Sequence, residues 1–162
     1  MKRWLIIAAL ACALSSTGAF AALNLQRSTT LTDSFGGTLS AATTGTVEIP
    51  GADTSTQVTL TNFHPHDTQS LVANGSLTRT HERSNETVTN TYNGSATLAG
   101  TDKEGKPVSD TVSLQDLQAV RDGDGPAFSG TIVLNGISID AAHMPDAAKK
   151  LLHRVLRVFD FE

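Results

Sequence analysis

The sequence predicts a mainly β protein: an antiparallel meander that forms a curved sheet or a sandwich, with one C-terminal amphipathic α-helix packed on it. Three observations support this fold class. Threonine, which favours strands over helices, occurs 21 times after residue 21. Short apolar segments separated by turn residues follow one another as far as Asp140. A helical period of apolar residues is found only near the end of the chain.

The first 21 residues have the pattern of a secretory signal peptide. Lys2 and Arg3 form a basic start, residues 5–14 are apolar, and Ala19-Phe20-Ala21 places small residues at both recognition positions of a cleavage site. The apolar stretch is shorter than the roughly 20 residues of a membrane-spanning helix. We therefore expect an exported protein, periplasmic or extracellular and of bacterial type, whose mature chain begins near Ala22 without a transmembrane segment.

The composition of this mature chain argues against several classes of function. It contains ten Lys and Arg residues and sixteen Asp and Glu residues, and the resulting net charge of −6 makes nucleic acid a poor partner. The only cysteine, Cys12, lies in the leader, where it is either discarded with the leader or lipidated at a poor lipobox-like match. A mature chain without cysteine has no disulfide and no zinc–thiolate site.

The N-terminal part of the mature chain is less clearly patterned than the middle. Residues 22–45 are rich in Thr, Ser and Gly with scattered apolar positions, which fits either a loose pair of strands or an arm. The β domain proper is predicted over residues 46–140. Its first strands are expected at residues 46–49, before Pro50-Gly51, and at residues 57–63, where apolar and polar residues alternate.

Four further strands, separated by turn sequences, make the centre of the meander. They are expected at residues 76–82, 87–92, 95–101 and 108–114. The pair Asn93-Gly94 predicts a type I′ turn between the second and third of these, because such a turn needs positive φ at both positions.

A second Asn-Gly pair interrupts the last predicted strand segment. Residues 128–140 contain Asn135-Gly136, which fits either a bulge in one strand or a tight turn between two strands. We expect the bulged single strand, because the four residues after Gly136 are few for a partner strand.

The end of the chain, residues 141–162, is predicted to be helical and to belong to the same domain. Pro145 suits the first turn of a helix, and apolar and basic residues separate onto opposite arcs from about residue 145 to residue 158. The apolar arc could lie on an anionic membrane surface, but covering one side of the sheet is the commoner use of such a helix.

Three histidines form the strongest candidate for a metal site. His64 and His66 alternate on an extended segment, so both imidazoles can point to one side and reach one ion. His81, on a later strand, is the candidate third ligand. A site of this kind would bind zinc or copper, although a polar loop containing Pro65 explains the same residues without any metal.

Complete catalytic motifs are missing from the sequence. It contains no G-x-S-x-G, S-x-x-K or H-E-x-x-H motif, no phosphate-binding loop and no dinucleotide-binding fingerprint. We therefore expect a non-enzymatic binding or structural protein of the cell envelope or secreted space. It would either carry a hydrophobic small molecule between sheet and helix or pair with another envelope protein through an exposed strand edge. The alternative is a metal-binding protein or metal-dependent enzyme that uses the His64/His66 pair.

Overall fold

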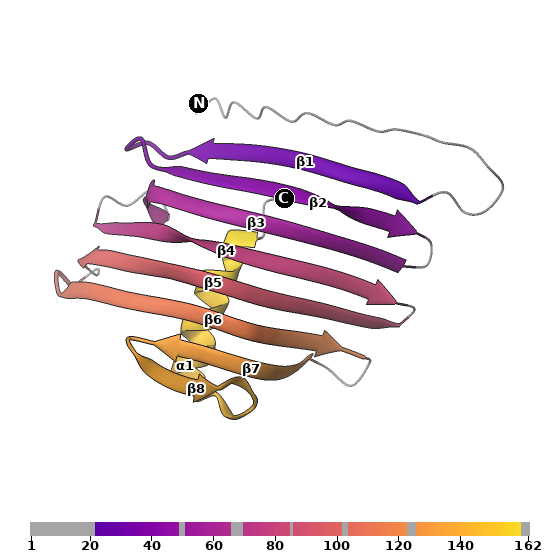
Figure 1. Cartoon of the computed structure of the whole chain (residues 1–162). Helices are drawn as coiled ribbons and strands as arrows, with labels where there is room; N and C mark the ends of the chain where they lie inside the picture. Colours follow the sequence, from indigo (N-terminus) through magenta and orange to yellow (C-terminus); the bar gives the residue numbers. More distant parts are fainter. Residues whose placement is uncertain are drawn as a thin grey trace.

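The computed structural model describes residues 22–48, 51–65, 70–84, 86–101, 104–122 and 126–159; the predicted signal peptide lies outside these residues. In this part of the chain eight strands form one sheet, in which sequential neighbours pair in the order β1 to β8 (Figure 1). The strands are β1 (Leu23–Thr32), β2 (Thr38–Glu48), β3 (Gly51–Phe63), β4 (Leu71–Ser84), β5 (Thr87–Thr101), β6 (Pro107–Arg121), β7 (Pro126–Leu134) and β8 (Ile137–Asp140).

Each neighbouring pair of strands is antiparallel. The predicted antiparallel meander is thus confirmed, and it forms one open, curved sheet rather than a sandwich of two. Most of the segment 22–45 forms β1 and β2, so the strand-pair interpretation applies there and the arm does not.

The pair Asn93-Gly94 lies inside β5 and not at a turn. β5 pairs with β4 along its length, while its register with β6 shifts between Tyr92 and Gly94, which marks a β-bulge. Gly94 has a φ of 115°, and a Cβ on it would overlap the backbone oxygen of Ser76. The predicted type I′ turn is therefore wrong, because β5 continues through this pair and Gly94 uses its positive φ inside the strand. The extra residue of the bulge lies on β6, where Gln115 and Asp116 are opposite Asn93 and Asp116 has a φ of 47°.

The pair Asn135-Gly136, in contrast, is a two-residue turn between β7 and β8. Both residues have positive φ, 50° and 81°, and Leu134 lies opposite Ile137. Asn135 is also bonded to β6, since its Oδ1 accepts from the backbone N–H of Thr111 at 2.7 Å. The bulged single strand expected here is wrong, because the turn is fixed from the neighbouring strand and the short β8 leads directly into a 3-10 helix that contacts β7.

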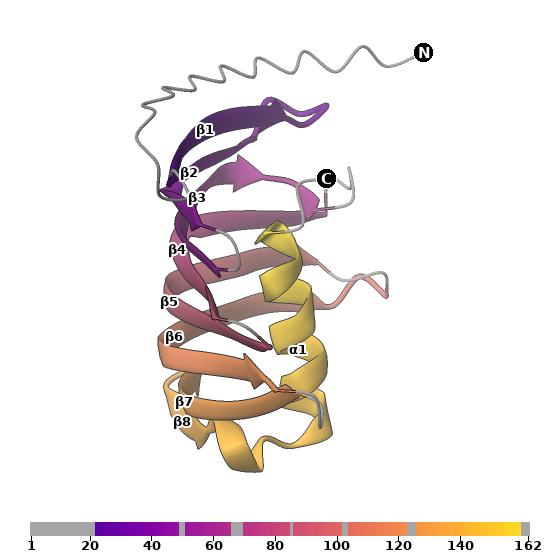
Figure 2. The same ribbon diagram turned by 90° about the vertical axis from the view of Figure 1, so that its right-hand side faces the viewer.

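One helical segment covers one face of the sheet. The 3-10 helix η2 (Ala141–His143) leads into α1 (Asp146–Leu156), and η3 (Arg157–Phe159) follows it. The predicted helix over 145–158 is confirmed to within a residue at each end. Figure 2 shows the helix on the concave side of the sheet, crossing the strands and ending beside β3. Among the described residues, no helix has the length and apolarity needed to span a bilayer.

The core lies between this helix and the sheet. Buried apolar side chains from both layers form one cluster, which accounts for the amphipathic pattern of the helix. Its members are Leu39, Ala41, Val58, Leu60, Ala73, Leu77, Val112, Leu114, Leu117, Ile132, Ala141, Met144, Ala148, Leu152 and Phe159.

Candidate functional site

β1 is an exposed edge strand with an unusually open hydrogen-bonding edge. It pairs with β2 over ten consecutive residues without a register shift, and no described strand pairs with its other side. Its outer edge therefore presents a row of backbone N–H and C=O groups to solvent. The opposite edge of the sheet is much shorter, because β8 has four residues.

The common devices that protect an edge strand are nearly absent from β1. Proteins blunt such edges with proline, bulges, short length or charged side chains. β1 has no proline, no bulge and one charged residue, Arg27. Its edge therefore has the properties of a template for another strand.

The two faces of β1 differ in character. Leu23, Leu25 and Leu31 share the face on which the core residues Leu39 and Ala41 of β2 lie. The opposite face carries polar side chains, Asn24, Gln26, Ser28, Thr30 and Thr32, and all of them are exposed. Because α1 and η3 end beside β3, the apolar face of β1 lies beyond the helix, and Leu23 is 38% exposed.

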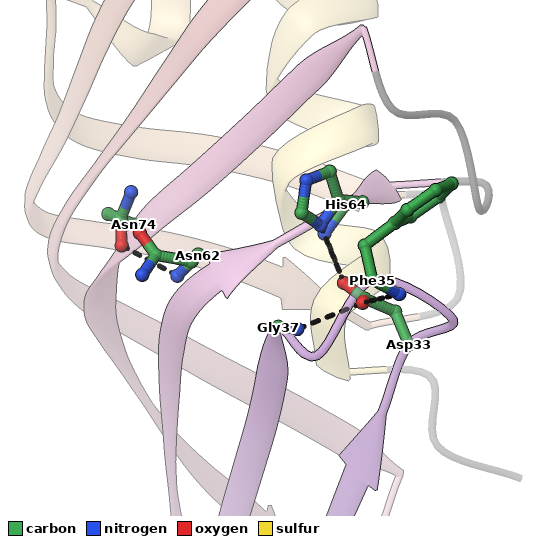
Figure 3. Close-up of polar contacts among 6 residues, drawn as sticks. All are labelled: Asp33, Phe35, Gly37, Asn62, His64 and Asn74. Atoms are coloured by element: carbon green, nitrogen blue, oxygen red, sulfur yellow. Dashed lines mark hydrogen bonds and ion pairs between the residues drawn. The ribbon is translucent and has the colours of Figure 1, made fainter.

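A buried carboxylate fixes the end of β1. Asp33 follows the strand directly, and its Oδ1 accepts hydrogen bonds from the backbone N–H groups of Phe35 at 2.8 Å and Gly37 at 2.9 Å (Figure 3). Its Oδ2 accepts from the backbone N–H of His64 at 2.6 Å and lies 3.0 Å from Nδ1 of the same residue. Since His64 follows β3, this carboxylate ties the end of β1 to the end of β3 across β2.

The surroundings of the carboxylate are closely packed. The ring of Phe35 lies against the imidazole of His64, with centroids 4.9 Å apart. A Cβ on Gly37 would overlap the backbone oxygen of Asn62 and would lie 2.5 Å from Asp33 Oδ2. Asn62 has a φ of 47° and donates its backbone N–H to Oδ1 of Asn74 at 2.7 Å, which holds the irregular end of β3 in place. We call Asp33, Phe35, Gly37 and His64 the Asp33 clamp.

These contacts set the ionisation of the clamp. Burial by itself raises the pKa of Asp33, but the hydrogen bonds from the backbone of His64 and Phe35, from the His64 ring and from Gly37 outweigh it. The net effect lowers the pKa of Asp33 from 3.8 to about 2. Asp33 is therefore a carboxylate over the whole neutral and mildly acidic range.

The lowered pKa predicts a dependence of stability on pH. The unfolded chain takes up a proton at Asp33 near pH 3.8 and the folded chain only near pH 2, so stability is present above about pH 5 and is lost as the pH falls toward 2. We expect a loss of about 2 kcal/mol from this group. Urea unfolding at a series of pH values measures it.

The matched comparison for this prediction is Asp33→Asn, which cannot ionise. The difference in unfolding free energy between the natural protein and Asp33→Asn should shrink as the pH falls from 5 to 2. Parallel profiles of the two proteins over that range would show that Asp33 does not carry the effect.

The structure does not bring the three candidate metal ligands together. His64 lies just beyond Phe63, which pairs with Ala73, and His81 lies roughly 26 Å further along β4 at the rise of an ordinary strand. Nδ1 of His81 lies 2.9 Å from Oδ1 of Asn90 on β5. His81 is therefore not a ligand of an ion held by His64, because ligands of one ion lie within a few ångströms of it.

The pair His64/His66 itself is not tested by this geometry. His66 lies outside the described residues, so the prediction of a two-histidine site stays a prediction. Among the residues that are described, no group of three or more His, Cys, Asp or Glu side chains is arranged to hold a metal ion. Nδ1 of His64 lies 3.0 Å from Oδ2 of Asp33, so this ring nitrogen already has a partner within the described residues.

Comparisons with protein-family models, with curated proteins and with solved structures give no match to this chain. The β1 edge and the Asp33 clamp are the structural features that indicate a function. Pairing through an exposed strand edge was expected from the sequence, but neither the position of this edge at β1 nor the clamp was predicted. The alternation of Leu23 and Leu25 with polar residues and the turn sequence Asp33-Ser34-Phe35-Gly36-Gly37 are signals that fit them.

Proposed function

We propose that this protein is an exported, non-enzymatic module of the cell envelope or secreted space that joins another polypeptide by strand addition to β1. The observation that carries the proposal is the ten-residue outer edge of β1. This strand pairs with β2 without a register shift and bears one charge. In strand addition the backbone supplies the hydrogen bonds, and side chains at alternate positions supply specificity.

The Asp33 clamp supports the same proposal. A binding element that is already held in its bound conformation loses less conformational entropy when the partner arrives. The clamp fixes the C-terminal end of β1 with a buried carboxylate, and the pairing with β2 fixes the rest of the strand. β1 is thus a preorganised edge and not a frayed end of the sheet.

Transport of a hydrophobic small molecule between sheet and helix has weaker support. The buried apolar side chains of the two layers form a single cluster that includes Leu77 of β4 and Leu152 of α1. Side chains packed together in this way occupy the space that such a ligand would need. The non-enzymatic part of the proposal rests on the sequence, which has no complete catalytic motif.

A photo-crosslinking amino acid on β1 tests the proposal. Gln26 is exposed on the polar face of this edge strand, while Ser95 is exposed on β5, between two paired neighbours. With the crosslinker at position 26, we expect covalent adducts with a second polypeptide in an exporting bacterium. The crosslinker at position 95 is the control and should give no adduct above background.

Mass spectrometry of the adducts identifies what was bound. Attachment of a polypeptide at position 26, by a segment in extended conformation, is the expected result. Equal adduct yields at positions 26 and 95, or no adducts at either, would contradict strand addition at β1.

A further inference from the structure

We propose that the strand added to β1 is β1 of a second copy of this chain, paired antiparallel so that Ser28 lies opposite Ser28 of the second copy. This inference rests on the proposed function and names the partner. It would join two open sheets into one continuous sheet across a two-fold axis.

Strand length favours pairing of β1 with itself over other pairings between copies. Two β1 strands can pair over most of their ten residues, whereas β1 and the other edge strand, β8, can pair over four. Antiparallel strands gain roughly one backbone hydrogen bond for each paired residue. The β1–β1 pairing is also closed, so it does not continue into a fibre as a head-to-tail pairing would.

Two-fold symmetry restricts the register. A two-fold axis between antiparallel strands keeps the helix-bearing faces of both sheets on the same side, so residues opposite each other must come from the same face of β1. Centring the pair on Arg27 would place two like charges directly opposite each other, which is destabilising. Centring it on Ser28 avoids this and still pairs residues 24–32 of each copy.

The side chains are complementary in the register centred on Ser28. On the apolar face, Leu25 lies opposite Leu31 of the second copy, and this contact occurs twice. Both side chains are half-buried in the single chain, so the pairing removes further apolar surface from water. Arg27 lies opposite Thr29 of the second copy, so the two Arg27 side chains are diagonal neighbours, roughly 7 to 8 Å apart, and not directly opposite each other.

The polar face of β1 is complementary in the same register. Gln26 lies opposite Thr30, and Ser28 meets its own copy on the axis. Hydroxyl pairs at opposite positions form favourable cross-strand contacts. Because a strand-edge interface is smaller than roughly 1,200 Å² in total, we expect a reversible dimer with a dissociation constant in the range of about 1 to 100 μM.

Opposite charges at position 28 test both the partner and the register. In the proposed dimer, Ser28→Lys brings two ammonium groups together on the axis and Ser28→Glu brings two carboxylates together, so each variant should associate more weakly than the natural protein. In an equal mixture, the two variants place Lys opposite Glu. At low ionic strength the mixed pair should associate about tenfold more tightly than either variant alone.

Sedimentation equilibrium of the full mature chain measures these constants. Ser28 is exposed on β1, so its variants are expected to fold, and recovery of association in the mixture shows directly that they do. The matched control places the same charges at Ser95, on the same face of the central strand β5. Ser95→Lys and Ser95→Glu should associate like the natural protein, both alone and mixed.

The outcomes separate this inference from the proposed function. A natural protein that stays monomeric up to about 1 mM, or a Lys/Glu mixture at position 28 that associates no better than the single variants, overturns the self-pairing. If position 26 then still crosslinks to a different polypeptide, strand addition at β1 stands and only the identity of the partner was wrong. If position 26 gives no adduct either, both proposals fail.

Discussion

Replacement of Asp33 by alanine is expected to lower the free energy of unfolding by about 3 to 4 kcal/mol. The substitution removes the acceptor for three backbone N–H groups, those of Phe35, Gly37 and His64, and for the His64 ring. The side chain of Asp33 is 2% exposed, so water cannot easily replace these bonds. Each buried donor left without a partner costs roughly 1 to 3 kcal/mol. Urea or guanidinium unfolding at pH 7 measures the loss.

Two variants make this expectation specific to the clamp. Asp33→Asn keeps one acceptor oxygen, but the donors of His64 then meet either a weaker, neutral acceptor or an amide N–H. The loss in free energy of unfolding should therefore be about half of that in Asp33→Ala. Asp53→Ala removes an exposed carboxylate from β3 and should change the free energy of unfolding by less than about 0.5 kcal/mol. Equal losses at positions 33 and 53 would show that the clamp contributes nothing in particular.

The same variant connects the clamp to the binding edge. Loss of the clamp frees the end of β1 first, because the carboxylate joins this strand to the end of β3. In Asp33→Ala, hydrogen exchange of backbone amides should therefore rise more in β1 and β2 than in the central β5, since local opening follows the weakest contacts.

The architecture could be predicted from the sequence where local patterns and tertiary packing agree. Pro145, Asp146 and the separated apolar and basic arcs all favour a helix at one place, and α1 with η3 occupies it. The central strands also follow their turn residues, as at Glu86, which lies between β4 and β5. In these segments the local preference and the packed structure demand the same conformation.

The two Asn-Gly pairs show where local patterns fail. Both pairs tolerate positive φ, and the sequence alone does not say whether a turn or a continuous strand beside a bulge uses it. The decision depends on neighbouring strands. Asn93 is bonded to Asp116 of β6 in both directions, through Nδ2 at 3.1 Å and Oδ1 at 2.8 Å, whereas Asn135 caps a turn against Thr111. Contacts between residues more than 20 positions apart in the chain thus reverse the two expectations.

The candidate site could not be predicted for the same reason. Asp33 and His64 are 31 positions apart, and neither residue carries a local signal for the other. The alternating histidines predict His64 as a metal ligand, while the structure places its Nδ1 beside Asp33. The edge position of β1 depends on the order of all eight strands, which no single segment determines.

Truncation of Phe159 to alanine is expected to cost about 3 to 4 kcal/mol and to loosen the helix from the sheet. Phe159 is 5% exposed at the end of η3, and its ring lies 5.7 Å from the ring of Tyr92 and 5.3 Å from the guanidinium carbon of Arg79. The ring therefore adds an aromatic pair and a cation–π contact to the apolar burial. Chemical denaturation measures the loss, and Ile137→Ala, at an apolar residue that is 68% exposed, is the control, with an expected loss of about 1 kcal/mol or less.

Proteolysis distinguishes loosening of the helix from a general loss of stability. Lys149 and Lys150 are exposed on α1, but a protease can cut after them only when the helix opens. Phe159→Ala should raise the rate of trypsin cleavage at these lysines more than the rate at Arg121, which lies at the end of β6. Because α1 and the sheet share one core, a helix that stays resistant in this variant would show that Phe159 does not hold the two layers together, and that the remaining helix contacts, such as Leu152, do so alone.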